Sequence, residues 1–321
     1  MNKDKSVVTV GTFDGVHRGH VAVVDEVLAR ARSLGARPLV ITFDRHPLSL
    51  IAPDRAPGLI TDPDRRDELL RELGAEVVRI PFTEEVRRLT AREWMARTVT
   101  DYGAVAMVLG YDNTFGSDGL GMTLRDFREI GADLGLDVTM APMVQGCSSS
   151  AVRRALRDGD VGLAAEILGR WYELDGNVAH GRKIGRTIGA PTANLRTDPR
   201  LQLPACGVYA AIVRQEARGK RQESTSSRKG EGLDSPLLTL NMAAVNVGSN
   251  PTVSSAGKIS VEAHLLDFDG DLYGKELRVQ LVARLRDEKK FDRITDLRDQ
   301  IATDASAARR LLSALMTDSA D

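Results

Sequence analysis

The first stretch of the chain suited to chemistry begins at Gly11 and reads Gly-Thr-Phe-Asp-Gly-Val-His-Arg-Gly-His. His17 and His20 are three positions apart, so they share one face at the start of a helix. A helix start offers backbone N–H groups and the positive end of the helix dipole to an anion. Two imidazoles beside a phosphate would stabilise the charge that develops during nucleotidyl transfer. A His-x-x-His pair could also be half of a zinc site, although no third ligand is apparent nearby.

A second stretch suited to anions spans residues 146–154 and reads Gly-Cys-Ser-Ser-Ser-Ala-Val-Arg-Arg. Serines before a helix are common N-caps, and taken alone they need no other explanation. Arg153 lies one turn into the expected helix, where its guanidinium could bind phosphate oxygens. Two anion-binding helix starts in one domain together favour a nucleoside triphosphate as the ligand.

The second half of the chain has its own candidate residues. Residues 181–195 form a basic, glycine-rich stretch that could cover phosphates, and the oxygens of Thr192 and Asn194 suit Mg²⁺ or phosphate. Glu262 lies on an alternating strand, where a carboxylate that faces a ligand could accept a proton from a hydroxyl group. Without context, a glycine-rich turn and a solvent-facing glutamate explain these features equally well.

Short apolar runs that alternate with amphipathic segments would position the residues of the first half. Strands are expected at residues 7–10, 38–43, 77–82, 104–109 and 138–142, and helices at 17–34, 62–73, 84–100 and 123–134. This alternation predicts a Rossmann-like α/β domain with a parallel sheet, which binds ligands at the carboxyl ends of its strands.

The pattern changes after a helical stretch at residues 149–168. Short strands broken by glycine are expected at residues 171–178, 208–214, 237–247, 259–268 and 276–285, followed by a closing helix at 292–316. Their spacing predicts a small antiparallel β-barrel, with a polar loop at residues 214–235. We therefore expect two domains, residues 1–168 and 169–321, in this chain of 321 residues.

Composition argues against several classes of protein. Lys and Arg number 44 against 45 Asp and Glu, and only 4% of residues are aromatic, so we expect no nucleic-acid partner. Two cysteines make no disulfide framework and are typical of a cytoplasmic protein. Neither a signal peptide nor a run of about eighteen apolar residues is present, so we expect no membrane association. The oligomeric state, including a homo-oligomer, stays open.

Together these motifs resemble one known family. Gly-x-Phe-Asp-Gly-x-His-x-Gly-His followed by Ser-Ser-Ser-x-x-Arg resembles the nucleotidyltransferases, and more closely the FMN adenylyltransferase domain of bacterial bifunctional riboflavin kinase/FAD synthetases. Residues 42–47 and 110–116 are similar to further stretches of that domain. Pro-Thr-Ala-Asn at 191–194, Asn-Val-Gly-Ser-Asn-Pro-Thr at 246–252 and Val-Glu-Ala-His-Leu at 261–265 resemble the riboflavin kinase domain of the same family.

The resemblance implies that the barrel phosphorylates riboflavin to FMN with ATP and Mg²⁺, and that the first domain joins FMN to a second ATP to give FAD. The implied ATP site of the first domain comprises Gly11, Phe13, Asp14, Gly15, His17, His20, Ser148, Ser149, Ser150 and Arg153. His17, His20 and Arg153 would act on its transition state. The implied ATP site of the kinase comprises Gly181, Arg182, Lys183, Gly185, Thr192 and Asn194, of which Thr192 and Asn194 would hold the metal. Glu262 would be the general base, and the implied flavin contacts are Asn113, Asn246, Glu262 and Arg286.

Three other functions stay open. Asn113 replaces an aromatic residue of the family motif, and the Arg-Gly usual in the family is absent from residues 117–121. A riboflavin kinase with a weak or inactive first domain is therefore one alternative. A non-catalytic flavin-binding regulatory protein is the second, and an adenylyltransferase for another small substrate is the third. The intact Pro-Thr-Ala-Asn stretch and Glu262 argue against the second, and the barrel motifs argue against the third.

Overall fold

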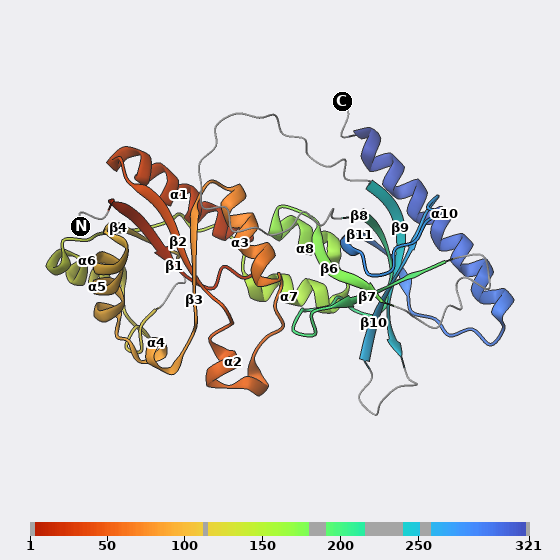
Figure 1. Cartoon of the computed structure of the whole chain (residues 1–321), viewed down its shortest axis with the longest axis horizontal. Coiled ribbons are helices and arrows are strands. Elements are labelled where there is room, and N and C mark those ends of the chain that lie inside the picture. Colours follow the sequence, from red (N-terminus) through yellow and green to blue (C-terminus); the bar gives the residue numbers. More distant parts are fainter. Residues whose placement is uncertain (1–3, 112–114, 180–190, 216–239, 251–257, 319–321) are drawn as a thin grey trace. The chain divides into compact units, whose positions relative to one another are not determined.

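The computed structural model describes residues 4–111, 115–179, 191–215, 240–250 and 258–318 (Figure 1). The chain forms two compact units. Unit 1 comprises residues 1–153, 167–169 and 200–202, and unit 2 comprises residues 154–166, 170–199 and 203–321. The sequence patterns place the division at residue 168, whereas the structure groups residues 154–166 with unit 2. A hydrogen bond of 2.9 Å from the backbone N–H of Ala205 to the carbonyl oxygen of Leu156 joins this segment to the rest of unit 2.

Unit 1 is built on a five-stranded parallel sheet in the order β3-β2-β1-β4-β5. Its strands are β1 (Ser6–Val10), β2 (Arg37–Phe43), β3 (Glu76–Ile80), β4 (Ala104–Leu109) and β5 (Asp137–Met140). Strand β1 pairs with β2 on one side and β4 on the other, so the order of connection reverses at β1. A crevice that can bind a ligand forms at such a reversal, at the carboxyl ends of the strands. The expected Rossmann-like fold is confirmed.

Nine helical segments accompany these strands in the described part of the chain before the barrel. They are α1 (Arg18–Leu34), α2 (Leu48–Ile51), η1 (Pro53–Arg55), α3 (Pro63–Glu72), α4 (Glu84–Arg88), α5 (Ala91–Tyr102), α6 (Leu124–Leu134), α7 (Ser149–Asp158) and α8 (Val161–Leu168). The single helix expected at residues 84–100 is wrong, because Thr90 and Glu93 form a capping box that starts α5. The stretch at 149–168 is also divided, with Gly159 in a left-handed conformation between α7 and α8.

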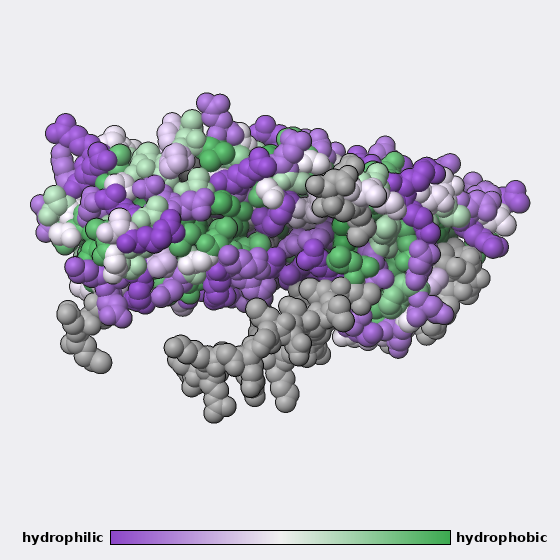
Figure 2. Space-filling model, turned by 90° about the horizontal axis from the view of Figure 1, so that it is seen from above, coloured by the Kyte–Doolittle hydropathy of each residue, from purple (hydrophilic) through white to green (hydrophobic). Residues whose placement is uncertain are grey.

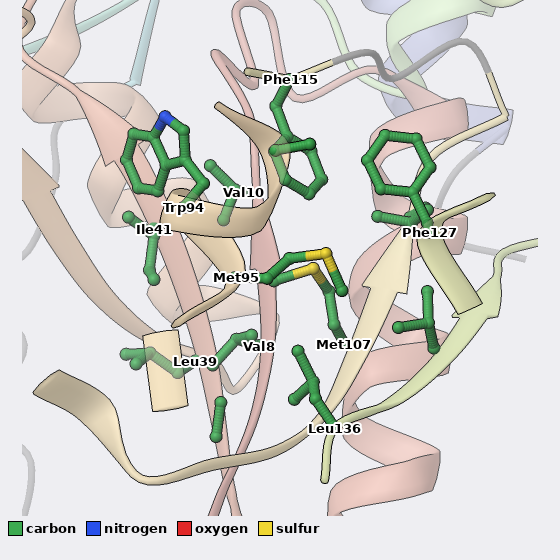
Figure 3. Close-up of a cluster of buried hydrophobic side chains, with 14 of the residues drawn as sticks. Val8, Val10, Leu39, Ile41, Trp94, Met95, Met107, Phe115, Phe127 and Leu136 are labelled. Atoms are coloured by element: carbon green, nitrogen blue, oxygen red, sulfur yellow. The ribbon is translucent and has the colours of Figure 1, made fainter. Parts of the chain in front are cut away.

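Apolar side chains pack on both faces of the parallel sheet. On one face, Val8 of β1 belongs to a cluster with Met95 of α5 and Met107 of β4, whose side chains lie next to each other in Figure 3. On the other face, Val7 packs in a second cluster with Val24 of α1. Every residue of β1 is buried. This burial explains why the strands of unit 1 are continuous apolar runs in the sequence.

Unit 2 is a closed antiparallel barrel in the order β10-β7-β6-β11-β8-β9. Its strands are β6 (Tyr172–Ala179), β7 (Ala193–Thr197), β8 (Gly207–Gln215), β9 (Leu240–Asn250), β10 (Lys258–Leu265) and β11 (Glu276–Asp287). Helix α10 (Ile294–Asp318) packs on β8 and β9, with Ala308 and Leu312 in one buried cluster with Ala210 and Ala244. The expected barrel with a closing helix is confirmed. Strand β7 was not anticipated, because its first three residues belong to the glycine-rich stretch at residues 181–195.

Hydrophilic residues predominate on the face drawn in Figure 2, with smaller hydrophobic areas between them. Most large apolar side chains lie inside the two units. Several are exposed, among them Leu120, Tyr111 and Met143, with 93%, 61% and 50% of their surface exposed. No helix in the described ranges is long and apolar enough to cross a membrane.

Candidate active sites

The loop between β1 and α1 places both predicted histidines at a helix start. His17 is the N-cap of α1, and its Nδ1 accepts a hydrogen bond of 3.3 Å from the backbone N–H of His20. The two imidazole rings stack with their centroids 3.6 Å apart, and the Phe13 ring meets His20 edge-on at 5.1 Å. Because Nδ1 of His17 is an acceptor, its neutral ring carries the proton on Nε2.

These histidines line a cavity of about 580 Å³ in unit 1, which we call the loop cavity. It lies at the carboxyl ends of β1, β4 and β5. Its wall includes Gly11, Thr12, Phe13, His17, His20, Gly110, Tyr111, Cys147, Ser148, Ser149 and Ser150. Ser148 Oγ accepts a hydrogen bond of 3.1 Å from the backbone N–H of Ala151 and so caps the start of α7. The first turns of α1 and α7 therefore meet at one cavity, which suits an extended polyphosphate.

Three predicted residues of this site, Asp14, Gly15 and Arg153, are not among the described residues that line the loop cavity, and two of them, Asp14 and Arg153, form an ion pair. Both members of the pair are buried, with 4% and 6% of their surface exposed. The Arg153 guanidinium donates to the Asp14 carboxylate and, at 2.7 Å, to the carbonyl oxygen of Gly58. Burial raises the pKa of the Asp14 carboxyl, and the charge of Arg153 opposes that rise. A buried guanidinium needs a compensating charge, which explains why Arg153 faces Asp14.

The loop also contains strained backbone. Phe13 and Val16 have φ angles of 48° and 40°. A positive φ is uncommon for any residue other than glycine, and it is rarest for a β-branched residue such as Val16. The Asp14 carboxylate accepts hydrogen bonds from the backbone N–H of Ile60 at 2.9 Å and of Thr61 at 3.2 Å. Ser149 Oγ donates to the Asp14 carbonyl oxygen at 2.9 Å. The surrounding structure therefore holds the loop in a conformation that its own residues disfavour, as at a preorganised ligand site.

In unit 2 the predicted residues form one row across the barrel. Asn194 on β7 lies opposite Glu262 on β10, and Glu262 lies opposite Asn246 on β9. The row continues through Val208 on β8 to Arg286 on β11. Opposite residues on neighbouring antiparallel strands project their side chains to the same face. The barrel register thus gathers polar residues that are far apart in the sequence.

A cavity of about 230 Å³ lies over this row, and we call it the barrel cavity. Among the predicted residues, it is lined by Thr192, Asn246, Glu262 and Arg286, whereas Asn194 is only the neighbour of Glu262 in the row. Sequence reasoning missed several further lining residues as site residues. They are His264, Glu288, Lys289, Phe291, Leu297, Ile301 and Asp304. Two signals in the sequence could have indicated these residues. His264 follows Glu262 by two positions on a strand and so shares its face. Leu297, Ile301 and Asp304 recur at the spacing of one helix face.

Arg286 links the barrel to α10 at the wall of this cavity. Its Nε and Nη2 donate to the two carboxylate oxygens of Asp304 at 2.9 and 2.7 Å. Gln300 Nε2 donates to the same carboxylate at 3.0 Å. The Arg286 side chain is 24% exposed and the Asp304 side chain only 8%. Arg286 therefore has a structural partner in addition to its place beside the cavity.

Oxygen donors just before β7, on β7 and on the neighbouring β10 fit the metal that the resemblance implies. Thr192 offers a hydroxyl, Asn194 an amide oxygen and Glu262 a carboxylate, and hard oxygen ligands of this kind suit Mg²⁺. Five predicted residues lie outside the described residues, namely Asn113, Gly181, Arg182, Lys183 and Gly185. Most of the polar loop predicted at 214–235 lies outside them as well.

Unit 1 has a cavity lined by two helix starts where the strand order of its parallel sheet reverses, and unit 2 has a cavity over a polar row of its closed barrel. This arrangement favours an enzyme with a separate ligand site in each of two domains. Comparison with family models agrees with this division. A model described as FAD synthetase matches residues 1–153, and a model described as riboflavin kinase matches residues 168–312. The chain belongs to the bifunctional riboflavin kinase/FMN adenylyltransferase family.

Relatives match over nearly the whole chain. The bifunctional riboflavin kinase/FMN adenylyltransferase of Pseudomonas fluorescens is 34% identical over 313 residues, covering 95% of this chain and 92% of the relative. The protein of the same name from Bacillus subtilis (strain 168) is 32% identical, covering 97% and 94%. A crystal structure from Streptococcus pneumoniae, described as a macrolide-efflux protein, has a TM-score of 0.78 at 31% identity and covers 96% of this chain and 97% of that one. The sequence similarity therefore extends through both units, and the fold is shared with the Streptococcus pneumoniae structure over nearly the whole chain.

Proposed function

We propose that this chain catalyses both reactions that its family name states, phosphorylation of riboflavin by ATP in unit 2 and adenylylation of FMN by ATP in unit 1. The observation that carries the proposal is that each unit has its own cavity, lined by residues suited to one of the two reactions. The family membership supports the same conclusion.

In unit 2, Glu262 would accept the proton of the riboflavin 5′-hydroxyl as its oxygen attacks the γ-phosphorus of ATP. One phosphorus–oxygen bond forms, the bond to ADP breaks, and FMN and ADP leave. Thr192 and Asn194 would hold Mg²⁺, which neutralises phosphate charge when bound. The apolar side chains of Phe291 and Ile301 in the cavity wall would face the flavin rings.

In unit 1, an oxygen of the FMN phosphate would attack the α-phosphorus of ATP, with release of pyrophosphate. His17, His20 and the first turns of α1 and α7 would stabilise the charge on the phosphate oxygens. Asp14 and Arg153 would hold the loop in place from behind the cavity wall. The stacked histidines and the capped start of α7 favour two working sites over the alternative of a kinase with an inactive first domain.

The test is a time course with riboflavin, ATP and Mg²⁺, in which FMN and FAD are separated by chromatography. We expect the wild-type protein to form both, His20→Ala to accumulate FMN, and Glu262→Gln to form neither. Direct supply of FMN should restore FAD synthesis in Glu262→Gln, because its adenylyltransferase site is intact. Flavin binding without ATP consumption by the wild type would refute the proposal in favour of a regulatory protein. FMN formation without FAD would support the kinase-only alternative.

We further propose that the enzyme works in the cytoplasm. Its two cysteines, Cys147 and Cys206, are free thiols in the structure, as is usual in a reducing compartment.

A further inference from the structure

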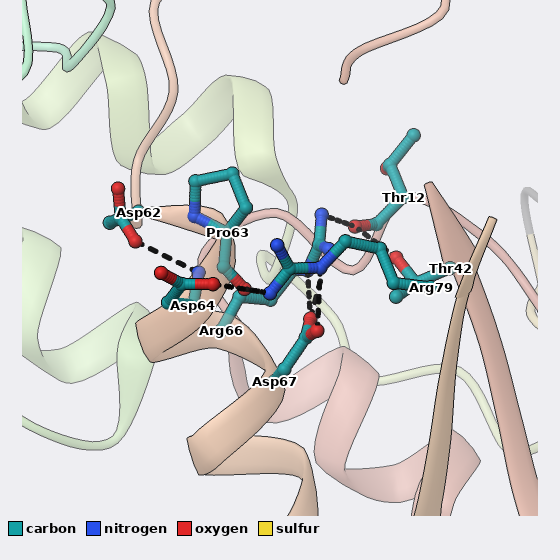
Figure 4. Close-up of polar contacts among 8 residues, drawn as sticks. All are labelled: Thr12, Thr42, Asp62, Pro63, Asp64, Arg66, Asp67 and Arg79. Carbon is teal, nitrogen blue, oxygen red and sulfur yellow. Dashed lines mark hydrogen bonds and ion pairs between the residues drawn. The ribbon is translucent and has the colours of Figure 1, made fainter. Parts of the chain in front are cut away.

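A group of charged residues lies behind the loop cavity, at the start of α3 (Figure 4). Asp67 is at its centre, and its side chain is only 2% exposed. One carboxylate oxygen accepts from Arg66 Nε at 3.1 Å and Nη2 at 2.9 Å, and the other accepts from Arg79 Nε at 2.7 Å. Arg79 also donates to Asp64 at 2.7 Å. Two guanidinium groups thus balance two carboxylates, which makes the burial of Arg66 and Asp67 tolerable.

The same group contacts the loop between β1 and α1. With Nε and Nη2 committed to Asp67, the remaining Nη1 of Arg66 donates to the carbonyl oxygen of Thr12 at 3.3 Å. Thr42 on β2 donates to that same oxygen from its hydroxyl at 3.2 Å. Two buried donors, supplied by α3 and β2, therefore fix the direction of one peptide group.

This peptide group joins two residues of the cavity wall, Thr12 and Phe13. The carbonyl and the N–H of a planar trans peptide point in opposite directions. The Phe13 N–H therefore points away from Arg66 and Thr42, and it donates to no acceptor among the residues that the structure describes. Phe13 itself is 4% exposed, and its φ of 48° keeps the peptide from adopting an ordinary extended path.

We propose that Arg66 is a positioning residue for adenylyl transfer. It holds the Thr12–Phe13 peptide so that the Phe13 N–H donates to a phosphate oxygen of the ATP bound in the loop cavity. The inference rests on the proposed adenylyltransferase function. A donor that is already aligned before the reaction needs no reorganisation as charge develops. This explains why two buried side chains, Arg66 and Thr42, both bind the Thr12 carbonyl oxygen.

Two substitutions remove the anchors one at a time. Arg66→Lys keeps the charge, but a lysine cannot engage Asp67 with two nitrogens and reach Thr12 with a third. Thr42→Val removes the other donor with little change of shape. The assay is FMN-dependent release of pyrophosphate as a function of ATP concentration. We expect kcat to fall about tenfold in Arg66→Lys and severalfold in Thr42→Val, since misplacement of one group by about 1 Å can cost up to a hundredfold.

Two controls separate positioning from folding. Riboflavin phosphorylation in unit 2 of the same molecules should stay within about twofold of wild type. Thr98→Val removes a buried hydroxyl of the same unit that donates to the Met95 carbonyl oxygen at 2.8 Å within α5, and it should leave pyrophosphate release unchanged. If Arg66→Lys fails to fold, Thr42→Val alone decides. Wild-type kcat in folded Thr42→Val would overturn the inference.

A binding measurement gives a second, independent readout. The chain has seven phenylalanines, so selective ¹⁵N labelling gives a simple amide spectrum. Addition of a non-hydrolysable ATP analogue should shift the Phe13 signal in the wild type, and less so in Thr42→Val. No shift at Phe13 in the wild type would overturn the inference. Absence of pyrophosphate release from the wild type would contradict the proposed function instead, and the amide measurement would still decide this inference.

Discussion

His17 has two roles at the start of α1, and two substitutions distinguish them. Its Nδ1 caps the helix by accepting the His20 N–H, and its ring stacks on His20 at the wall of the loop cavity. His17→Asn keeps a side-chain oxygen that can cap the helix, whereas His17→Ala removes the cap and the ring together. We expect both variants to lose FAD synthesis, and only the alanine variant to lose stability.

The magnitudes follow from the geometry. Loss of an N-cap costs about 0.5–2 kcal/mol, and the 3.3 Å distance of this cap places His17→Ala near the lower end, at about 0.5–1 kcal/mol. In a unit of this size that corresponds to a fall in Tm of about 1–4 °C. Asparagine is among the best N-cap residues, so His17→Asn should stay within about 0.5 kcal/mol of wild type. Removal of one group that stabilises transition-state charge should lower the rate of adenylyl transfer about a hundredfold in either variant.

The rate is measured as pyrophosphate release from FMN and ATP, and the stability as the thermal unfolding of each variant. Riboflavin phosphorylation by the same molecules serves as an internal control, because unit 2 is unchanged. Adenylyl transfer by His17→Asn within about threefold of wild type would refute the reasoning, because the ring would then act only as a cap. Equal destabilisation of both variants would refute the assignment of Nδ1 as the cap.

Three further predictions concern titratable groups that are buried or half-buried. Asp304→Asn removes the carboxylate that Arg286 binds, and it should lower the free energy of unfolding of unit 2, measured in urea, by about 1–2 kcal/mol. This figure is reduced because the arginine is partly exposed. The same variant should raise the KM for riboflavin, and an unchanged urea midpoint would contradict the prediction. Asp14→Asn leaves Arg153 buried without its carboxylate and should cost unit 1 about 3–5 kcal/mol, so a loss below about 1 kcal/mol would show that the pair is not structural. Burial and the charge of Arg153 lower the pKa of His46 below its usual 6.5, against the opposing attraction of Asp14. Near and below pH 6.5, the folded state therefore binds fewer protons than the unfolded state. The stability that neutral His46 contributes is fully present above pH 6.5, and it is lost as the pH falls from there through the folded pKa. Unfolding free energies measured between about pH 7.5 and pH 5.5 should therefore fall less in His46→Asn than in the wild type, and equal slopes would contradict the assignment.

Local patterns were sufficient for the strands of the parallel sheet and for several of the residues that line the loop cavity. The run at residues 104–109 was expected as a strand and is β4, because a strand buried on both faces is apolar throughout. His17, His20 and the serines at 148–150 could be recognised because helix starts and caps depend on residues only a few positions apart. The division between α4 and α5 depends on a single N-cap residue, Thr90, and the apolar pattern predicted one helix there instead of two.

The partners of the charged residues could not be read in this way. The sequence indicated that Arg153 was suited to a phosphate, and the family resemblance implied a flavin contact for Arg286. The structure shows each of them on a carboxylate, Asp14 and Asp304 respectively. Such pairs join segments far apart in the chain, and burial of one charge demands the other, so only packing reveals which carboxylate is near.

The row of Asn194, Glu262, Asn246 and Arg286 shows the same division between local and long-range information. The alternation around Glu262 was visible in the sequence, and it determined which residues of β10 share a face. Which residues of β7, β9 and β11 face them depends on the register of the barrel, because a shift of one residue turns every side chain of a strand to the other face. The residue types and the local elements of both sites were therefore present in the sequence, and their assembly into cavities depended on the long-range pairing of strands and charges.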